Sequence, residues 1–209
     1  MTHRRVLIGV LAAMLALGAT VASLAQTSGG GGADPKALFE ELKKLEGDWD
    51  AQWQSRTYQA DKPAVRTQIR VIAGGSAVRE TTGTGTDQEM ASVYHLDGND
   101  LVITHYCALG NQPQMRLSKT KSKLAKAGAA AAAAGENATT LSFSLSRVSN
   151  LAPPVTAKAA AAKKNPASSY MRLDEIKIVS PDQVETHWTI FHDGKKFAER
   201  VSTLKRVKS

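Results

Sequence analysis

The sequence predicts a mainly β protein: an antiparallel up-and-down barrel of about eight to ten strands, preceded by one short helix. After Gly47 the spacing of apolar residues changes from the helical period of about 3.6 to the strand period of about 2, and short alternating segments then follow as far as residue 207. Asp-Gly pairs at 97–98 and 193–194 join neighbouring segments as hairpin turns. Sequential antiparallel strands hide their edges by closing on themselves, which favours a barrel.

The helix is expected directly before the first strand, from Pro35 onwards. Asp34 can cap it, and Pro35 suits a first helical position, where its missing N–H is no loss. Gly47 suits a position just past the end. The apolar stripe at helical spacing consists of Leu38, Phe39, Leu42 and Leu45. We therefore expect the helix to pack on an apolar surface as a lid or plug.

Residues 1–25 are predicted to be a signal peptide, because a basic start and an apolar run precede small residues at Ser23 and Ala25. Its removal implies an exported protein, periplasmic or secreted, with no transmembrane segment left after cleavage. Retention as a membrane anchor is the alternative. Residues 26–34 are expected to be a flexible linker and residues 35–209 a single domain.

The net charge of +8 is concentrated in a few segments. Arg4 and Arg5 lie in the signal peptide, and the rest of the excess lies in two low-complexity inserts at 118–138 and 152–168, which are predicted to be disordered surface loops. The strand-forming remainder carries no net charge. A specific nucleic-acid-binding face is therefore not expected, while weak contact of the Lys-rich inserts with an anionic envelope surface remains an alternative.

Cys107 is the only cysteine, which excludes an internal disulfide and a zinc site built from several thiolates. The sequence also contains no H-x-H or H-E-x-x-H pattern, so no metal site is predicted. Buried cysteine usually acts as a small apolar side chain. We expect Cys107 to be part of an interior wall.

The segment Gly47-Asp48-Trp49, after the helix, resembles the G-x-W start of lipocalins and related calycin barrels. The segment from Ser92 to Met115 resembles uncharacterised exported bacterial proteins with a lipocalin-like barrel. The resemblance implies this fold and a general binding role, with Trp49 plugging one barrel end beneath a basic residue of the last strand, Arg200, Lys205 or Arg206. Where it implies His-Met-His, this chain has Tyr-Met-Arg at 170–172.

Strand alternation sorts the side chains of the first Asp-Gly hairpin, SVYHLDGNDLVITHYC at 92–107. For a two-residue turn, one face carries bulky apolar side chains together with Tyr94, His105 and Cys107, and the other carries His95 and Tyr106. The first face is predicted to point into the barrel.

The second hairpin is predicted to place Glu199 on the same face as Trp188 and roughly across from it. A carboxylate on an apolar interior face must be paired, hydrogen-bonded or protonated. His105 or Tyr94 are the candidate partners if the barrel brings these strands together.

The preferred function is non-catalytic binding of a small hydrophobic or amphipathic ligand in the barrel. One alternative is a structural or envelope-interaction domain with a filled barrel. Another is an enzyme using His105 and Glu199 as an acid–base pair, although no nucleophile is evident. No cofactor is predicted, and haem is retained as an alternative through His105 alone. The expected ligand contacts are Trp49, Trp53, Tyr94, His105, Cys107, Trp188 and Glu199.

Overall fold

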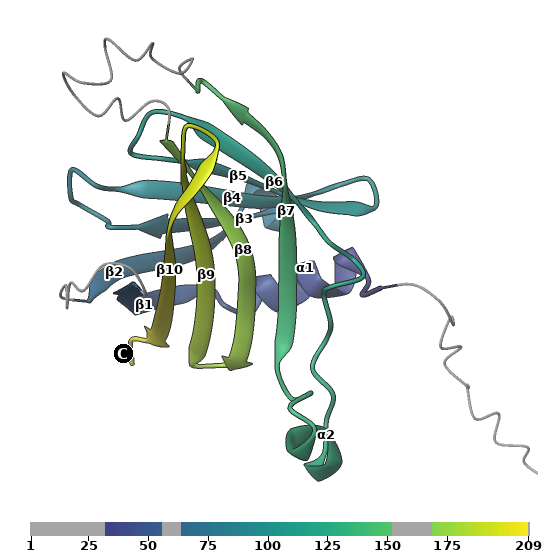
Figure 1. Ribbon diagram of the computed structural model, residues 1–209. Helices are drawn as coiled ribbons and strands as arrows, with labels where there is room; N and C mark the ends of the chain where they lie inside the picture. The colour runs from purple at the N-terminus through teal and green to yellow at the C-terminus, as the bar shows by residue number, and fades with distance from the viewer. Residues whose placement is uncertain (1–31, 56–63, 152–168, 209) are drawn as a thin grey trace, which may run out of the picture. The chain divides into compact units, whose positions relative to one another are not determined.

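Ten antiparallel strands close into a barrel in the computed structural model, which describes residues 32–55, 64–151 and 169–208 (Figure 1). Consecutive strands pair with each other, and β1 pairs with β10 to complete the circle. The predicted up-and-down barrel is confirmed. The elements in chain order are α1 (Pro35–Lys43), β1 (Gly47–Ser55), β2 (Val65–Ile72), η1 (Ala73–Gly75), β3 (Ala77–Thr82), β4 (Met90–Asp97), β5 (Asp100–Tyr106), β6 (Gln112–Leu117), α2 (Ala129–Ala133), β7 (Thr139–Ser149), β8 (Ser169–Ser180), β9 (Gln183–His192) and β10 (Lys195–Arg206).

Helix α1 covers one end of the barrel, which we call the closed end. Asp34 caps the helix by accepting a hydrogen bond from the Lys36 backbone N–H at 3.1 Å, and Pro35 occupies the first helical position, as predicted. The helix contacts β4, β5 and β7. Its predicted apolar stripe, including Leu45 just beyond it, is buried in the core. These contacts make α1 a plug.

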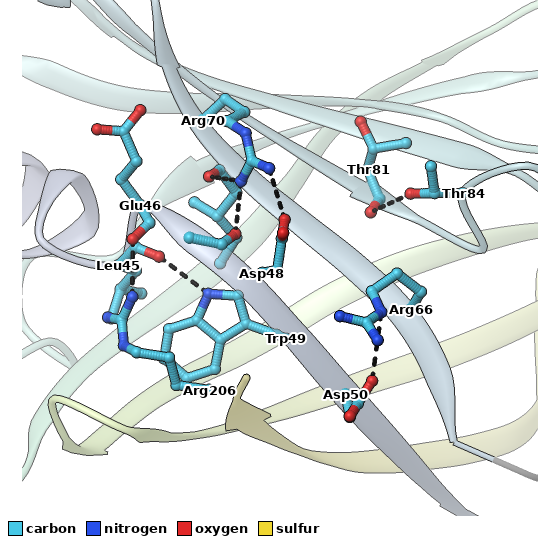
Figure 2. A network of polar contacts seen from close by, with 12 residues as sticks. Leu45, Glu46, Asp48, Trp49, Asp50, Arg66, Arg70, Thr81, Thr84 and Arg206 are labelled. Carbon is cyan, nitrogen blue, oxygen red and sulfur yellow. Dashed lines mark hydrogen bonds and ion pairs between the residues drawn. The ribbon is translucent and has the colours of Figure 1, made fainter. Parts of the chain in front are cut away.

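Trp49 lies below this helix, and no part of its side chain is exposed. Its indole N–H donates to the Leu45 carbonyl at 2.9 Å, and the Arg206 guanidinium stacks on its ring at 4.3 Å (Figure 2). Arg206 also donates to the carbonyls of Glu46 and Lys44. Of the three basic residues considered for the last strand, Arg206 is therefore the one that packs across Trp49.

Gly47 begins β1 rather than following the helix directly. Its φ of +150° is unfavourable for other residues, and a Cβ at this position would lie 2.5 Å from Arg206 Nη1. Arg70 of β2 donates to the Gly47 carbonyl at 2.7 Å and to Asp48 Oδ1 at 2.5 Å (Figure 2). The hydrogen bond from Arg70 to the Asp48 carboxylate holds the pKa of Asp48 below its usual value. Polar contacts thus fasten the closed end around its apolar plug.

The insert at 118–138 is ordered, contrary to the predicted disordered loop. Lys123 and Thr140 form a β-bridge, Lys126 pairs with Glu136 at 2.9 Å, and α2 lies at the tip of the β6–β7 connection (Figure 1). The backbone of the insert pairs with the beginning of β7, and this pairing holds the insert in place. The amino-acid composition of the insert does not predict such pairing. The signal peptide at 1–25, most of the linker at 26–34 and the insert at 152–168 lie outside the described residues.

Among the described residues, the β3–β4, β5–β6 and β9–β10 connections lie at the opposite end of the barrel, which we call the open end. The β9–β10 hairpin lies at the top of Figure 1. No helix among the described residues reaches the length and apolar character needed to cross a membrane.

Candidate functional site

The β4–β5 hairpin places its side chains on the faces that the sequence predicts. Ser92 pairs with His105, and Tyr94 pairs with Ile103, so these four side chains share the inner face. Tyr94 and His105 are buried, whereas Tyr106 on the outer face is 50% exposed. The two-residue turn at Gly98 and Asn99, which follows Asp97, fixes this register, because a shift by one residue would exchange the two faces.

His105 is a neutral side chain in the middle of the barrel. Its Nδ1 lies 2.9 Å from the Ser92 hydroxyl, and its ring centroid lies 4.8 Å from that of Trp188. Among the described residues, Nε2 has no hydrogen-bond partner. Burial lowers the pKa of His105 to about 4, because the charged imidazolium would lose its hydration. At neutral pH this ring can donate or accept a hydrogen bond but carries no charge.

The space beside His105 is small. The mid-barrel cavity measures about 10 Å³, which is roughly the volume that one water needs. Its walls combine Trp53 and Trp188 with several hydroxyl groups, and the hydroxyls of Thr186 and Ser202 bond each other at 2.9 Å. The middle of the barrel is therefore filled by side chains. A porphyrin on His105 does not fit this space.

The interior carboxylate is Glu80 on β3, a residue that the sequence reasoning missed. The Tyr94 hydroxyl donates to Glu80 Oε2 at 2.5 Å, and both residues line a second small cavity of about 20 Å³ next to α1. Burial raises the pKa of Glu80, although the hydrogen bond from Tyr94 opposes this effect. Burial and the neighbouring carboxylate raise the pKa of Tyr94 well above its usual value. Alternation of Val78 and Glu80 along the strand could have indicated this position.

Glu199, in contrast, faces outward, so its predicted interior position is wrong. The β9–β10 register shifts at Phe197, between Lys196 and Ala198, and Trp188 consequently pairs with Arg200. Such a bulge moves every side chain that follows it to the other face. Glu199 contacts Lys196 and lies 3.8 Å from His187 Nε2, both outside the barrel. His105 and Glu199 therefore do not form an acid–base pair.

The open end contains a much larger pocket, of about 370 Å³. Met90 and Met171 border both this pocket and the mid-barrel cavity, so the pocket lies directly over the filled interior. We call it the open-end pocket. Its lining consists of Gln88, Met90, Cys107, Ala108, Leu109, Ser169, Met171, Ile190, His192, Phe197 and Arg200.

Arg200 brings a positive charge into this mostly apolar pocket. The guanidinium lies 5.6 Å from the Trp53 ring centroid, and no carboxylate among the described residues lies within ion-pair distance of it. Burial lowers the pKa of Arg200, and the nearby Cys107 has the opposite, smaller effect. Burial raises the pKa of the Cys107 thiol, which keeps it protonated at neutral pH.

The seven predicted contact residues are thus distributed over the whole barrel. Trp49 belongs to the closed end, Tyr94 borders the cavity next to α1, and Glu199 lies outside. Trp53, His105 and Trp188 line the mid-barrel cavity, and Cys107 lines the open-end pocket. Within the described part of the chain, no three His, Cys, Asp or Glu side chains gather as metal ligands would.

The described residues form a closed ten-stranded antiparallel barrel that is plugged by α1 at one end and has the open-end pocket at the other. No family model matches the chain, and no curated protein matches it. Among solved structures, it is similar to a protein of unknown function from the DUF3598 family of Nostoc punctiforme, with 13% identity, 79% of this chain covered and a TM-score of 0.36. The chain spans 49% of the length of that structure's chain. This likeness assigns no function.

Proposed function

We propose that the protein binds a small hydrophobic or amphipathic ligand in the open-end pocket, without catalysis. The observation that carries this proposal is the pocket of about 370 Å³, a volume within the range of about 300 to 1,000 Å³ typical of small-ligand sites. Apolar side chains such as Ile190 and Leu109 dominate its wall, and Phe197 at the hairpin is 63% exposed. A ligand that covers these groups removes apolar surface from water.

The site differs from the one expected from sequence, because the ligand lies above the barrel interior rather than within it. The water-sized cavity around His105 admits no ligand unless Met90 and Met171 move. Methionine side chains adapt readily to new partners. The two methionines therefore form the floor of the site.

Octanol is a suitable neutral probe, and methionine methyl NMR locates its site. With isotope-labelled methionine methyl groups, saturating octanol is expected to shift the Met90 and Met171 signals. Met115 is fully buried in the barrel and does not line the open-end pocket, so its signal should remain unchanged. If no signal shifts in a saturable way, or if Met115 alone does, the proposal is wrong.

Matched tryptophan substitutions provide the control. Ile190→Trp fills the open-end pocket and should abolish octanol binding. Tyr106→Trp places the same side chain on the outer face of β5, where the native residue is half exposed, and should leave binding unchanged. Equal binding by both variants would contradict the proposed site.

A second candidate function, envelope interaction by a filled barrel, is favoured by the small mid-barrel cavity. In the first Lys-rich insert, Lys119 pairs with Asp100 at 3.1 Å and Lys126 with Glu136, which leaves Lys121 and Lys123 as exposed positive charges. Sedimentation with vesicles of anionic phospholipid tests this candidate. Binding lost in Lys121→Ala/Lys123→Ala, together with no octanol binding, would favour it over ligand binding.

We also propose that the chain is an exported lipocalin-like barrel. The sequence of residues 1–25 and the packing of Arg206 across Trp49 support this proposal. Expression in a bacterial host with an export pathway should yield a periplasmic or secreted protein that begins at residue 26, which mass spectrometry of the intact protein measures. Full-length protein retained in the membrane would contradict it.

A further inference from the structure

Two arginines of β10 each lie over a tryptophan of β1, at opposite ends of the barrel. Arg206 lies 4.3 Å from the Trp49 ring centroid, and Arg200 lies 5.6 Å from that of Trp53. The two sites have the same pair of residue types on the same two strands. They differ in the hydrogen-bond acceptors and carboxylates that contact the guanidinium.

Arg206 has a full set of acceptors. It donates to the carbonyls of Glu46, Lys44 and Pro181 at 2.7, 3.2 and 2.9 Å, and it pairs with Asp182 at 3.2 Å. A guanidinium carries five N–H donors in a planar fork, so these acceptors use most of its capacity. The charge at the closed end is therefore compensated within the chain.

Arg200 has no such set among the described residues. Its only ring contact there is Trp53, and it forms neither an ion pair nor a hydrogen bond with any described residue. The side chain is partly buried in an apolar pocket, where an uncompensated charge is unfavourable. The charged donors of Arg200 are available to a ligand that enters this pocket.

We propose that the ligand of the open-end pocket is an amphipathic anion whose carboxylate or similar group binds Arg200. This inference rests on the proposed function and specifies its ligand class. A carboxylate matches the guanidinium fork with two parallel hydrogen bonds, which a neutral alcohol cannot form. The apolar part of the ligand then lies against Ile190, Leu109 and Phe197 of the same pocket.

The experiment compares octanoate with octanol, which share the same chain length but differ in charge. Calorimetric titration of the wild type at neutral pH is expected to show tighter binding of octanoate. Arg200→Met should weaken octanoate binding about tenfold or more, because it removes the charge-assisted hydrogen bonds to the carboxylate. The same variant should change octanol binding less than about threefold, since the apolar contacts remain.

Two further variants separate a specific contact from general charge. Lys195→Met removes an exposed positive charge from the same strand and should leave octanoate binding unchanged. Arg200→Lys keeps the charge but loses the planar fork, so it should retain an intermediate preference for octanoate. If Lys195→Met weakened octanoate binding as much as Arg200→Met does, surface charge in general would explain the effect. The assignment to Arg200 would then be overturned.

The outcomes distinguish this inference from the proposed function. If octanol and octanoate bind the wild type equally, and Arg200→Met weakens neither, the pocket binds ligands but the anion preference is overturned. If neither probe binds, both proposals are overturned. Circular dichroism of each variant verifies that the barrel is folded, so that loss of binding is assigned to the site.

Discussion

The two ends of this barrel contain the same pair of residue types, an arginine of β10 over a tryptophan of β1, in different surroundings. At the closed end, Trp49 is completely buried, and Arg206 is surrounded by acceptors. At the open end, Phe197 is 63% exposed and Arg200 faces a pocket of about 370 Å³ without an acidic partner among the described residues. At the closed end the Arg206 charge and the Trp49 N–H have partners within the chain. At the open end, apolar surface and the Arg200 charge line a pocket.

We therefore expect stability and the proposed ligand binding to depend on separate parts of the molecule. The middle of the barrel is similar to the closed end, because its cavity of about 10 Å³ has no room for a ligand larger than a water molecule. Substitutions at the closed end should change unfolding, and substitutions at the open end should change binding.

Trp49→Ala should produce the largest effect. Removal of this fully buried side chain leaves a cavity, and it is expected to lower the free energy of unfolding by about 3–5 kcal/mol. Urea denaturation followed by circular dichroism measures the loss. Octanol affinity of the folded fraction should not change, because Trp49 lies at the other end of the barrel. A loss below about 1 kcal/mol would contradict the contribution of Trp49 to the packing of the closed end.

His105 should make stability depend on pH. Its folded-state pKa of about 4 lies below the ordinary value of 6.5, so between these values the unfolded chain binds a proton that the folded chain does not. Stability is therefore complete above about pH 6.5 and is lost as the pH falls towards 4.

The corresponding variant is His105→Asn, which keeps a hydrogen-bonding group near Ser92. Between pH 7 and pH 4 the wild type should lose about 3 kcal/mol more than the variant, because one pKa unit corresponds to about 1.4 kcal/mol. Urea unfolding at a series of pH values measures the difference. Parallel pH profiles for the two proteins would show that His105 is not held neutral by burial.

The two arginines should respond differently to the same substitution. Arg206→Met leaves the carbonyls of Glu46, Lys44 and Pro181 without their donor and should destabilise the fold by about 1–3 kcal/mol. Arg200→Met should change stability by less than about 0.5 kcal/mol or increase it slightly, because it removes an uncompensated charge. Thermal or urea unfolding of both variants makes the comparison. Equal destabilisation would remove the distinction between the two ends.

The smallest effect concerns the reactivity of Cys107. Burial raises the pKa of this thiol, so N-ethylmaleimide should react more slowly with the folded protein than with the unfolded chain at neutral pH. Octanol should slow the reaction several-fold further, because Cys107 lines the open-end pocket. Mass spectrometry over time measures the rate. An unchanged rate at saturating octanol would place the ligand elsewhere.

The sequence predicted the fold because its signals are local. Alternation, Asp-Gly turns and the Asp34-Pro35 helix start each depend on a few neighbouring residues, and the β4–β5 hairpin keeps the predicted faces for the same reason. Glu199 was assigned to the wrong face because the bulge at Phe197 changes the alternation without a clear sequence signal.

The open-end pocket could not be predicted in the same way. Alternation indicates which face a side chain takes, but not its height along the barrel. Trp49 and Trp53 share a face of β1, yet the first plugs the closed end and the second lies in the mid-barrel. Arg200 and Cys107 meet only after β5 and β10 take their places in the closed barrel. Of the seven predicted contacts, Cys107 lines the open-end pocket. Its place there depends on how the strands are arranged in the closed barrel, which the sequence alone does not show.

In the proposed site Arg200, and not Arg206, binds the anionic ligand. The most direct measurement follows the isotope-labelled Nε–H signals of both arginines by NMR during a titration of the wild type with octanoate. The Arg200 signal should move and saturate, while the Arg206 signal should remain in place because its acceptors are already within the chain. Saturable octanoate binding that leaves Arg200 unmoved, or that moves Arg206 instead, would contradict the claim.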